Sequence, residues 1–236
     1  MILTEFLDNL AYGELSGLYM GSGNSGRIHQ EELPKLITYI NHGLTDLYTR
    51  FRLKSSEVIV EQQAGQTVYE LHSKYAVANT ESVEPVKYII DSANYPFKDD
   101  IIKIFQAFAE NGDELPLNNQ EVDNGVYTLS HNVVQIPIIE IGDAVSFLYQ
   151  ANHHKLQYLD RSSLTQSIEL PAFLIEPLLM FVGSKAISKL GSESGMTEGQ
   201  LLMQKYELAL QQVKTAGALN EEINYGYDRL RGNGWV

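Results

Sequence analysis

The chain has 236 residues, 44% of them hydrophobic, which is enough to bury a core in one large domain or two small ones. Its 30 acidic residues against 17 basic ones give a formal net charge of -13, which argues against a protein that grips nucleic-acid phosphates. The lack of cysteine excludes disulfides, thiolate metal sites and cysteine nucleophiles. The N-terminal segment is acidic and no apolar run approaches the ~20 residues of a membrane span, so we expect a soluble protein made inside the cell.

The beginning of the chain predicts a short helix followed by a glycine-rich connector. Apolar residues recur at helical spacing between residues 2 and 11, namely Leu3, Phe6, Leu7 and Leu10. The GSGNSG sequence of residues 21–26 matches the dinucleotide-binding pattern G-x-G-x-x-G, but that fingerprint needs a buried strand directly before it. Because only Leu18–Met20 could form such a strand, we interpret residues 13–26 as a flexible connector.

The stretch Glu31–Leu53 predicts one long amphipathic helix, and it is the best-defined element of the chain. Its apolar residues recur at steps of three and four and form one broad stripe: Leu33, Leu36, Ile37, Ile40, Leu44, Leu47, Tyr48 and Phe51. Asp46 and Arg50 lie off this stripe, on a polar face. One neighbour cannot cover so wide a stripe, so we expect at least two further helices with matching faces.

After this helix the pattern changes to short β-rich runs. Glu57–Gln63 and Thr67–Leu71 predict a hairpin, and Asn111-Gly112 has the sequence of a tight hairpin turn. Further strands are predicted over Val86–Ile90, Ile101–Phe108, Val126–Leu129, Val133–Ile139 and Ala144–Gln150. We therefore expect an antiparallel β sandwich or barrel.

Helical spacing returns after residue 170 with two predicted helices. The first lies between Pro171 and Gly191. Thr197 and Gln200 form a T-x-x-Q capping box that predicts the start of the second, which Gly217 ends. The predicted inward face of the second helix consists of Leu201, Leu202, Tyr206, Ala209, Leu210 and Val213.

These elements together predict an α+β protein. A four-helix bundle is formed by N-terminal helices in residues 1–54 and C-terminal helices in residues 161–217. The β domain, residues 55–160, is inserted between the two pairs. Residues 218–236 show no periodicity and cannot form a core, so they predict an extended C-terminal arm.

The C-terminal arm carries the residue types that dominate binding hot spots. They are Tyr225, Tyr227, Arg229, Arg231 and Trp235, the last being the single tryptophan of the chain. A terminus that leaves these aromatic side chains in solvent gains nothing. We therefore interpret the arm as a docking element for a partner rather than a frayed end.

The candidates for enzymatic chemistry are weak. His153-His154 is adjacent to a predicted strand, where neighbouring side chains point to opposite faces, and no third metal ligand stands at a suitable spacing. Asp99-Asp100 resembles half of a glycosidase carboxylate pair, but in so acidic a chain these residues are better interpreted as flanking a strand. The sequence also lacks a P-loop, HExxH and G-x-S-x-G. We expect no catalytic, cofactor-binding or metal site, and a role in binding or assembly.

The order of elements resembles that of the head-to-tail adaptor proteins of short-tailed bacteriophages, also called tail tubular or head-completion proteins. The stretches that carry the resemblance are Leu36–Leu71, Asp143–Leu156 and Ile168–Gly195. In such proteins a long helix leads into a β hairpin, a late strand ends in a short polar segment, and a proline-initiated helix precedes a final helix and tail. The glycine-rich connector and the β region are longer here than in the smallest members.

The resemblance implies a structural virion protein at the head-tail interface and not an enzyme. Such a subunit forms a ring, typically a dodecamer, that binds the portal protein on one side and the tail nozzle or other tail proteins on the other. The arm residues then contact the portal, double-stranded DNA passes through without specific binding, and no membrane is involved. Net negative charge suits a DNA conduit.

Two other functions are compatible with the sequence. One is a hydrolytic or carbohydrate-active enzyme whose β domain uses Asp99, Asp100 or His153. The other is a non-viral module whose β domain binds a peptide or a glycan.

Overall fold

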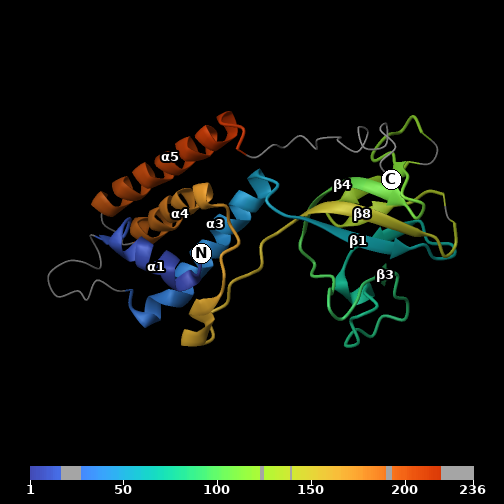
Figure 1. Cartoon of the computed structure of the whole chain (residues 1–236), viewed down its shortest axis with the longest axis horizontal. Helices are drawn as coiled ribbons and strands as arrows, with labels where there is room; N and C mark the ends of the chain where they lie inside the picture. Colours follow the sequence, from blue (N-terminus) through green and yellow to red (C-terminus); the bar gives the residue numbers. More distant parts are fainter. Residues whose placement is uncertain (17–27, 123–124, 139, 190–192, 219–236) are drawn as a thin grey trace, which may run out of the picture. The chain divides into compact units, whose positions relative to one another are not determined.

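The computed structural model describes residues 1–16, 28–122, 125–138, 140–189 and 193–218 (Figure 1). The fold is mixed α+β, as predicted, with helices and two antiparallel sheets. The chain divides into two compact units, Met1–Phe51 with His154–Val236, and Arg52–His153. The β domain, predicted as residues 55–160, thus begins three residues earlier and ends seven residues earlier than predicted. Among the described helices, none has the length and apolar character needed to cross a membrane.

The first unit, called the helical unit, is built from both ends of the chain. Its α-helices are α1 (Leu3–Tyr12), α3 (Leu33–Arg50), α4 (Ile175–Ser188) and α5 (Glu193–Thr215). Its 3-10 turns are η1 (Gln30–Glu32), η3 (Arg161–Thr165) and η4 (Ala172–Leu174). Pro34 lies in the first turn of α3, where its missing N–H leaves no bond unmade.

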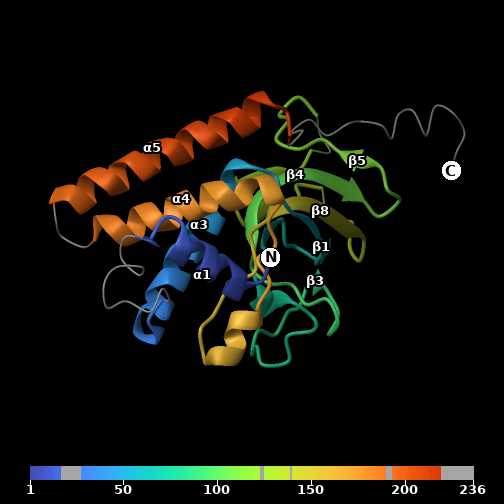
Figure 2. The ribbon, with the colours of Figure 1, turned by 60° about the vertical axis from the view of Figure 1, so that its left-hand side comes forward.

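Helix α4 is the element on which the helical unit is assembled. It contacts α1, α3 and α5, and Figure 2 shows it between α5 and α1. Leu178, Val182 and Ile187 are buried on it, while α3 buries the predicted stripe from Leu33 to Tyr48. The sequence suggested that residues 31–53 would have this central role. Helix α4 takes it because its apolar residues are spread around more of its circumference and meet three neighbours.

Hydrogen bonds join the N-terminal and C-terminal parts of the helical unit. The Asn41 side chain donates to the carbonyl of Leu156 and accepts from its N–H, both at 2.9 Å. Ile2 pairs with Ser167 as an antiparallel bridge. The Tyr48 hydroxyl donates to the carbonyl of Glu169. These contacts make Asn41 a structural residue of the helical unit, since its amide satisfies both polar groups of one peptide unit.

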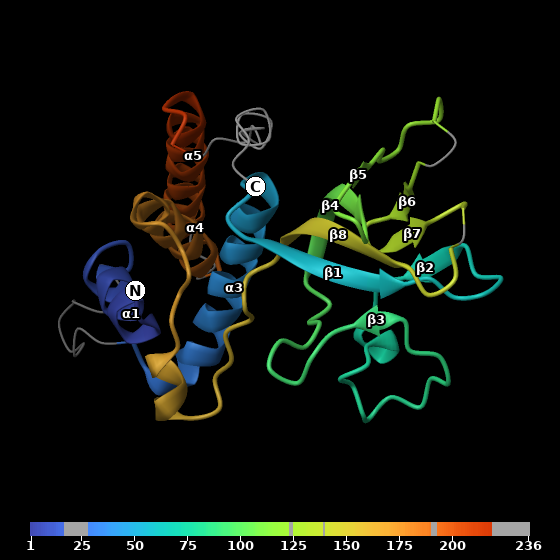
Figure 3. The same cartoon turned by 45° about the vertical axis from the view of Figure 1, so that its right-hand side comes forward.

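The second unit, called the β unit, contains a 5-stranded sheet in the order β3-β1-β8-β4-β5 and a 3-stranded sheet in the order β2-β7-β6. The strands are β1 (Ser55–Glu61), β2 (Val68–Glu70), β3 (Ile89–Ile90), β4 (Ile101–Ala109), β5 (Glu114–Leu115), β6 (Tyr127–Ser130), β7 (Val133–Gln135) and β8 (Ala144–Ala151). Figure 3 shows β1, β8 and β4 side by side. Within the described part of the chain neither sheet closes into a barrel.

Both sheets contribute to one hydrophobic cluster. Val58 of β1 and Phe147 of β8 lie in it together with Tyr69 of β2 and Val134 of β7. The alternation of Val145, Phe147 and Tyr149 that predicted a strand places all three side chains in this cluster. The first and last strands of the unit are direct neighbours, because Ser55 pairs with Gln150 and the N–H of Ala151 donates to the carbonyl of Lys54.

The predicted hairpin between residues 57 and 71 is wrong. Strand β1 pairs with β3 and β8, whereas β2 pairs with β7 in the other sheet. The Tyr69 hydroxyl accepts from the N–H of Gln63 and donates to the carbonyl of Gln66. These two bonds fix the connection as a closed loop that leads from one sheet to the other. The hairpin predicted at Asn111-Gly112 is confirmed, because β4 pairs with β5 and Gly112 has a φ of +84°.

The predicted start of the last helix is also wrong. Helix α5 begins at Glu193, and Thr197 lies inside it with its hydroxyl donating to the carbonyl of Glu193. Gly199 explains the earlier start, because it lies against Ser188 of α4 and this contact holds the first turns of α5 in place. Leu201, which was predicted to face inward, has 51% of its surface exposed.

We predict that Gly199→Ala destabilises the helical unit although alanine favours helix. A Cβ at this position would lie 2.0 Å from Ser188 Oγ and 3.0 Å from the carbonyl oxygen of Ser184. The overlap costs about 1–3 kcal/mol, more than the roughly 1 kcal/mol that alanine gains over glycine in a helix. Chemical denaturation of the wild type and the variant measures the difference.

Ser188→Ala provides the control in a double-mutant cycle, since it removes the nearest atom. The second substitution should restore part of the lost stability. Equal losses with and without Ser188→Ala would contradict the close contact.

Candidate functional site

The arm residues singled out by sequence, Tyr225, Tyr227, Arg229, Arg231 and Trp235, lie outside the described residues. So do residues 17–26 of the glycine-rich connector and Gly191, the predicted end of a helix. The described chain ends at Ala218, just after Gly217, whose φ of +61° follows the last turn of α5. The remaining candidates therefore come from the two units themselves.

Asp99 and Asp100 have structural partners at the start of β4. Asp99 has a positive φ of 56°, and its carboxylate accepts from the N–H and the hydroxyl of Ser73 at 2.6 and 2.5 Å. Asp100 accepts from the hydroxyl of Tyr149 at 2.8 Å. Burial raises the pKa of Tyr149, and Asp100 contributes to the rise. Both aspartates directly precede β4, as the sequence predicted.

His72, Ser73 and Asp99 lie together but are not arranged as a catalytic triad. A triad needs the serine hydroxyl to donate to the imidazole, whereas Ser73 Oγ donates to Asp99. The Nδ1 atom of His72 instead accepts from the N–H of Lys74, and it lies 3.7 Å from the Asp99 carboxylate. His153 and His154 follow the end of β8, one on each side of the division between the units. Among the described residues, no group of three or more His, Asp or Glu could hold a metal ion.

A polar cluster that the sequence analysis did not single out joins α3 to α5. The Arg50 guanidinium binds both carboxylate oxygens of Glu207, at 2.7 and 2.9 Å, and its Nε lies 2.9 Å from Asp46. The buried Tyr206 donates its hydroxyl to Asp46 at 2.5 Å. The hydrogen bond to Glu207 raises the pKa of Arg50, and burial raises the pKa of Tyr206. The signal in the sequence was the i,i+4 pair of Asp46 and Arg50.

This polar cluster has a structural role, since it links α3 to α5. Tyr206 is 0% exposed and its ring stacks edge-on against Phe181 of α4, at 5.3 Å between centroids. Each charged group already has a partner within the cluster. The arrangement therefore orients α5 on α3 and α4 and leaves no group poised for chemistry.

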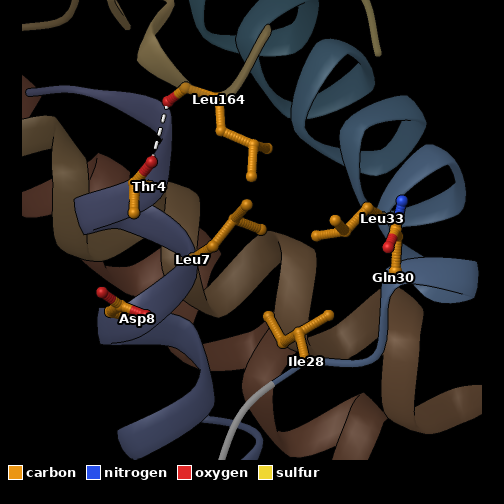
Figure 4. A pocket seen from close by; sticks show the side chains of 7 residues that line it. All are labelled: Thr4, Leu7, Asp8, Ile28, Gln30, Leu33 and Leu164. Carbon is orange, nitrogen blue, oxygen red and sulfur yellow. Dashed lines mark hydrogen bonds between the residues drawn. The ribbon is translucent and has the colours of Figure 1, made fainter. Parts of the chain in front are cut away.

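One depression in the helical unit lies between α1, the start of α3 and η3. It has a volume of about 210 Å³, and Figure 4 shows the side chains of Leu7 and Leu33 pointing toward each other across it. The hydroxyl of Thr4 donates to the carbonyl of Leu164 at its rim. Ile28, another lining residue, directly follows the undescribed residues 17–27. Among the described lining residues most are apolar, and Asp8 is the charged one.

A larger groove of about 510 Å³ runs along β1 in the β unit. Ser56, Glu57 and Tyr149 line it, and further lining residues come from the segment Asp91–Lys98, which we call the wall. The Asp91 carboxylate accepts from the N–H groups of Ala78 and Phe97, which holds this wall in place. Tyr95, on the wall, is 84% exposed. Exposed aromatic surface over a groove with a fixed wall is typical of a recognition surface.

Neither a known protein family nor a curated protein matches the sequence.

We predict that the protein loses stability steeply above pH 10. Burial raises the pKa of Tyr48, Tyr88, Tyr149 and Tyr206 above the ordinary tyrosine value of 10.0. Below pH 10 these tyrosines are protonated in both states, so their contribution is fully present. As the pH rises further the unfolded chain loses protons that the folded chain keeps, which favours unfolding. Thermal melts between pH 8 and 11.5 measure the decline.

Tyr206→Phe tests the contribution of the polar cluster. It should destabilise the protein by about 1 kcal/mol at neutral pH, because it removes the hydrogen bond to Asp46, and it should make the alkaline decline shallower. Tyr12→Phe is the matched control in the same unit, since Tyr12 is 57% exposed. If Tyr206→Phe left the melting temperature unchanged at neutral pH and in the alkaline range, the hydrogen bond to Asp46 would not contribute to stability.

Proposed function

We propose that the chain is the subunit of a ring that joins the portal of a short-tailed bacteriophage head to its tail. In this subunit residues 1–54 and 161–217 form a four-helix bundle, and residues 55–160 form a β sandwich. The ring binds portal protein on one side and the tail nozzle or other tail proteins on the other. Its work is structural, within the virion, and it needs no cofactor.

The observation that carries the proposal is the way in which the chain is divided. Helices from both ends build one unit while the middle of the chain builds another, the arrangement that the resemblance implies. The long helix, the late strand and the proline-initiated helix of the resemblance correspond to α3, β8 and η4–α4. The β hairpin that follows the long helix in the resemblance has no counterpart, because β1 pairs with β3 and β8 while β2 pairs with β7. Asp99 and Asp100, the candidates for enzymatic chemistry, are engaged by Ser73 and Tyr149.

The outer face of α5 supports packing between subunits. Leu201 and Leu208 stand one heptad apart on this helix and are 51% and 58% exposed. Two apolar side chains seven residues apart form one stripe, which a neighbouring helix covers in a ring. We place the lateral contact of the ring at this stripe.

The net charge of -13 fits a channel for DNA. A wall with the same sign of charge as the phosphates repels the duplex and does not hold it, so DNA passes without specific binding. The arm residues Tyr225, Tyr227, Arg229, Arg231 and Trp235 dock on a partner, which the resemblance identifies as the portal. The aromatic and arginine contacts supply the binding free energy of this docking.

We predict that Leu201→Glu with Leu208→Glu abolishes the ring. Light scattering of the purified protein, alone and with portal rings of the same virus, should give the mass of a ring for the wild type and of a single chain for the variant. The matched control is Gln204→Glu with Gln211→Glu, which adds the same charge to neighbouring exposed positions without removing apolar surface. A wild type that stays monomeric and ignores portal rings would refute the connector.

A second prediction concerns the arm. A chain ending at Gly217 should melt at the temperature of the full chain, because no residue of the described core is lost. Its affinity for portal rings should fall by about tenfold or more, the usual effect of removing aromatic hot spots. Undiminished binding would show that the arm is not the docking element.

A further inference from the structure

Strand β1 has an open edge next to the groove. Its ladder with β8 covers the whole strand, from Ser55 to Glu61, but its ladder with β3 covers only Ile59 and Val60. Figure 3 shows β3 as a short arrow beside β1. The chain leaves the edge after Ile90 and turns between Ser92 and Tyr95, whose backbone groups bridge each other.

The hydrogen-bond pattern shows which groups this edge offers. Ala151 donates to Lys54 and Gln62 donates to Asp143, so even-numbered residues of β1 direct their backbone groups toward β8. The N–H of Glu61 donates to Tyr88, so odd-numbered residues direct theirs toward β3. Beyond the end of β3, the N–H and C=O of Ser55 and Glu57 therefore face the groove. Among the described residues no backbone hydrogen bond on this side satisfies them.

An edge of this kind selects an extended strand as its ligand. Main-chain groups of the added strand bond to Ser55 and Glu57, and alternate side chains pack against the wall that carries Tyr95 and Phe97. A strand of five residues spans about 17 Å, so about three of its residues cover the roughly 10 Å of open edge between Ser55 and Val58 and the others lie beyond it. The groove of about 510 Å³ is open to receive it.

The chain itself contains a segment with the required pattern. The arm as a whole shows no periodicity, but within the short run of residues 223–228 Ile223, Tyr225 and Tyr227 alternate with Asn224, Gly226 and Asp228, as in a strand with one apolar face. The segment belongs to residues 219–236, which follow the last helix and span at most about 60 Å when extended.

We propose that residues 223–227 of one copy add as a strand to the open edge of β1 in a neighbouring copy. The inference rests on the proposed ring, in which each subunit gives its arm to the next and the exchange closes around the circle. It divides the arm into two parts. Tyr225 and Tyr227, which the proposed function gives to the portal contact, then bind between copies instead, and Arg229, Arg231 and Trp235 keep the portal contact.

Cross-linking of full-length chains tests the proposal, since the natural chain has no cysteine. Asn94→Cys, in the wall of the groove, and Asp228→Cys, in the arm, are placed on separate chains with different tags and joined by a short bismaleimide. We expect a cross-linked dimer that contains one chain with each tag. Val83→Cys replaces Asn94→Cys as the control, because Val83 is 96% exposed and does not line the groove. Equal yields at both positions would overturn the proposal.

Glu57→Pro tests the backbone bond directly. It removes an N–H that faces the groove and no backbone bond to β8, so the sheet keeps its ladder, as edge prolines do. The side-chain bond from the Ser146 hydroxyl to the Glu57 carboxylate is lost equally in Glu57→Pro and in its control Glu57→Ala. The yield of cross-linked dimer should fall by about tenfold, whereas Glu57→Ala, which keeps the N–H, should change it by less than about threefold. Melting curves verify that both variants fold. Equal yields for the two variants would exclude strand addition, and cross-linking confined to single chains carrying both cysteines would exclude the second copy.

Light scattering with portal rings separates this inference from the connector function. Rings that bind portal without any cross-link between copies would refute the arm exchange and leave the connector standing. A wild type that forms no ring and ignores portal would refute the connector, and with it the exchange between neighbouring copies.

Discussion

The helical unit depends on close approach between helices at glycine positions, where no Cβ keeps the neighbouring element away. Gly43 of α3 lies against Leu178 and Phe181 of α4, where a Cβ would come within 2.5 Å of Leu178. Gly183 of α4 meets Glu14 and Leu202, and Gly199 of α5 meets Ser188. Each glycine brings a neighbouring element close to α4. Without these approaches, the polar cluster of Asp46, Arg50, Tyr206 and Glu207 would lack its geometry, because its hydrogen bonds span α3 and α5 over short distances.

Much of the fold could be predicted from local patterns. The stripe of Glu31–Leu53 gave helix α3, the alternation at Val145, Phe147 and Tyr149 gave strand β8, and Asn111-Gly112 gave the β4–β5 turn. In each case a short stretch contains the period or turn chemistry that decides its structure. The width of one apolar stripe predicted that helices from both ends of the chain lie together, but it made residues 31–53 the central helix, whereas α1 and α3 pack on α4.

The errors arose where distant contacts decide the structure. Strand β1 pairs with β8, far along the sequence, and nothing near Gln63 distinguishes a loop between sheets from a hairpin. Thr197 has the sequence of a helix cap, but Gly199 against α4 keeps the preceding turn helical. The open edge of β1 could not be predicted either, because it depends on where β3 stops. A local indication that the chain turns away from this edge is the sequence Asn94-Tyr95-Pro96, because proline restricts the backbone of the residue before it.

The two ends of the β unit are neighbours, and this makes the unit an insert that can vary without disturbing the helices. Ser55 and Gln150 are ladder partners, so the polypeptide enters and leaves the sheet at one place. The two ends of this insert of roughly a hundred residues therefore lie as close together as the ends of a tight turn. Once the sheet has formed, connecting the flanking helices through it costs little chain entropy. Such an insert is modular in the evolutionary sense. Mutation can enlarge it, trim it or exchange it for another sheet with adjoining ends while the helical scaffold keeps its contacts.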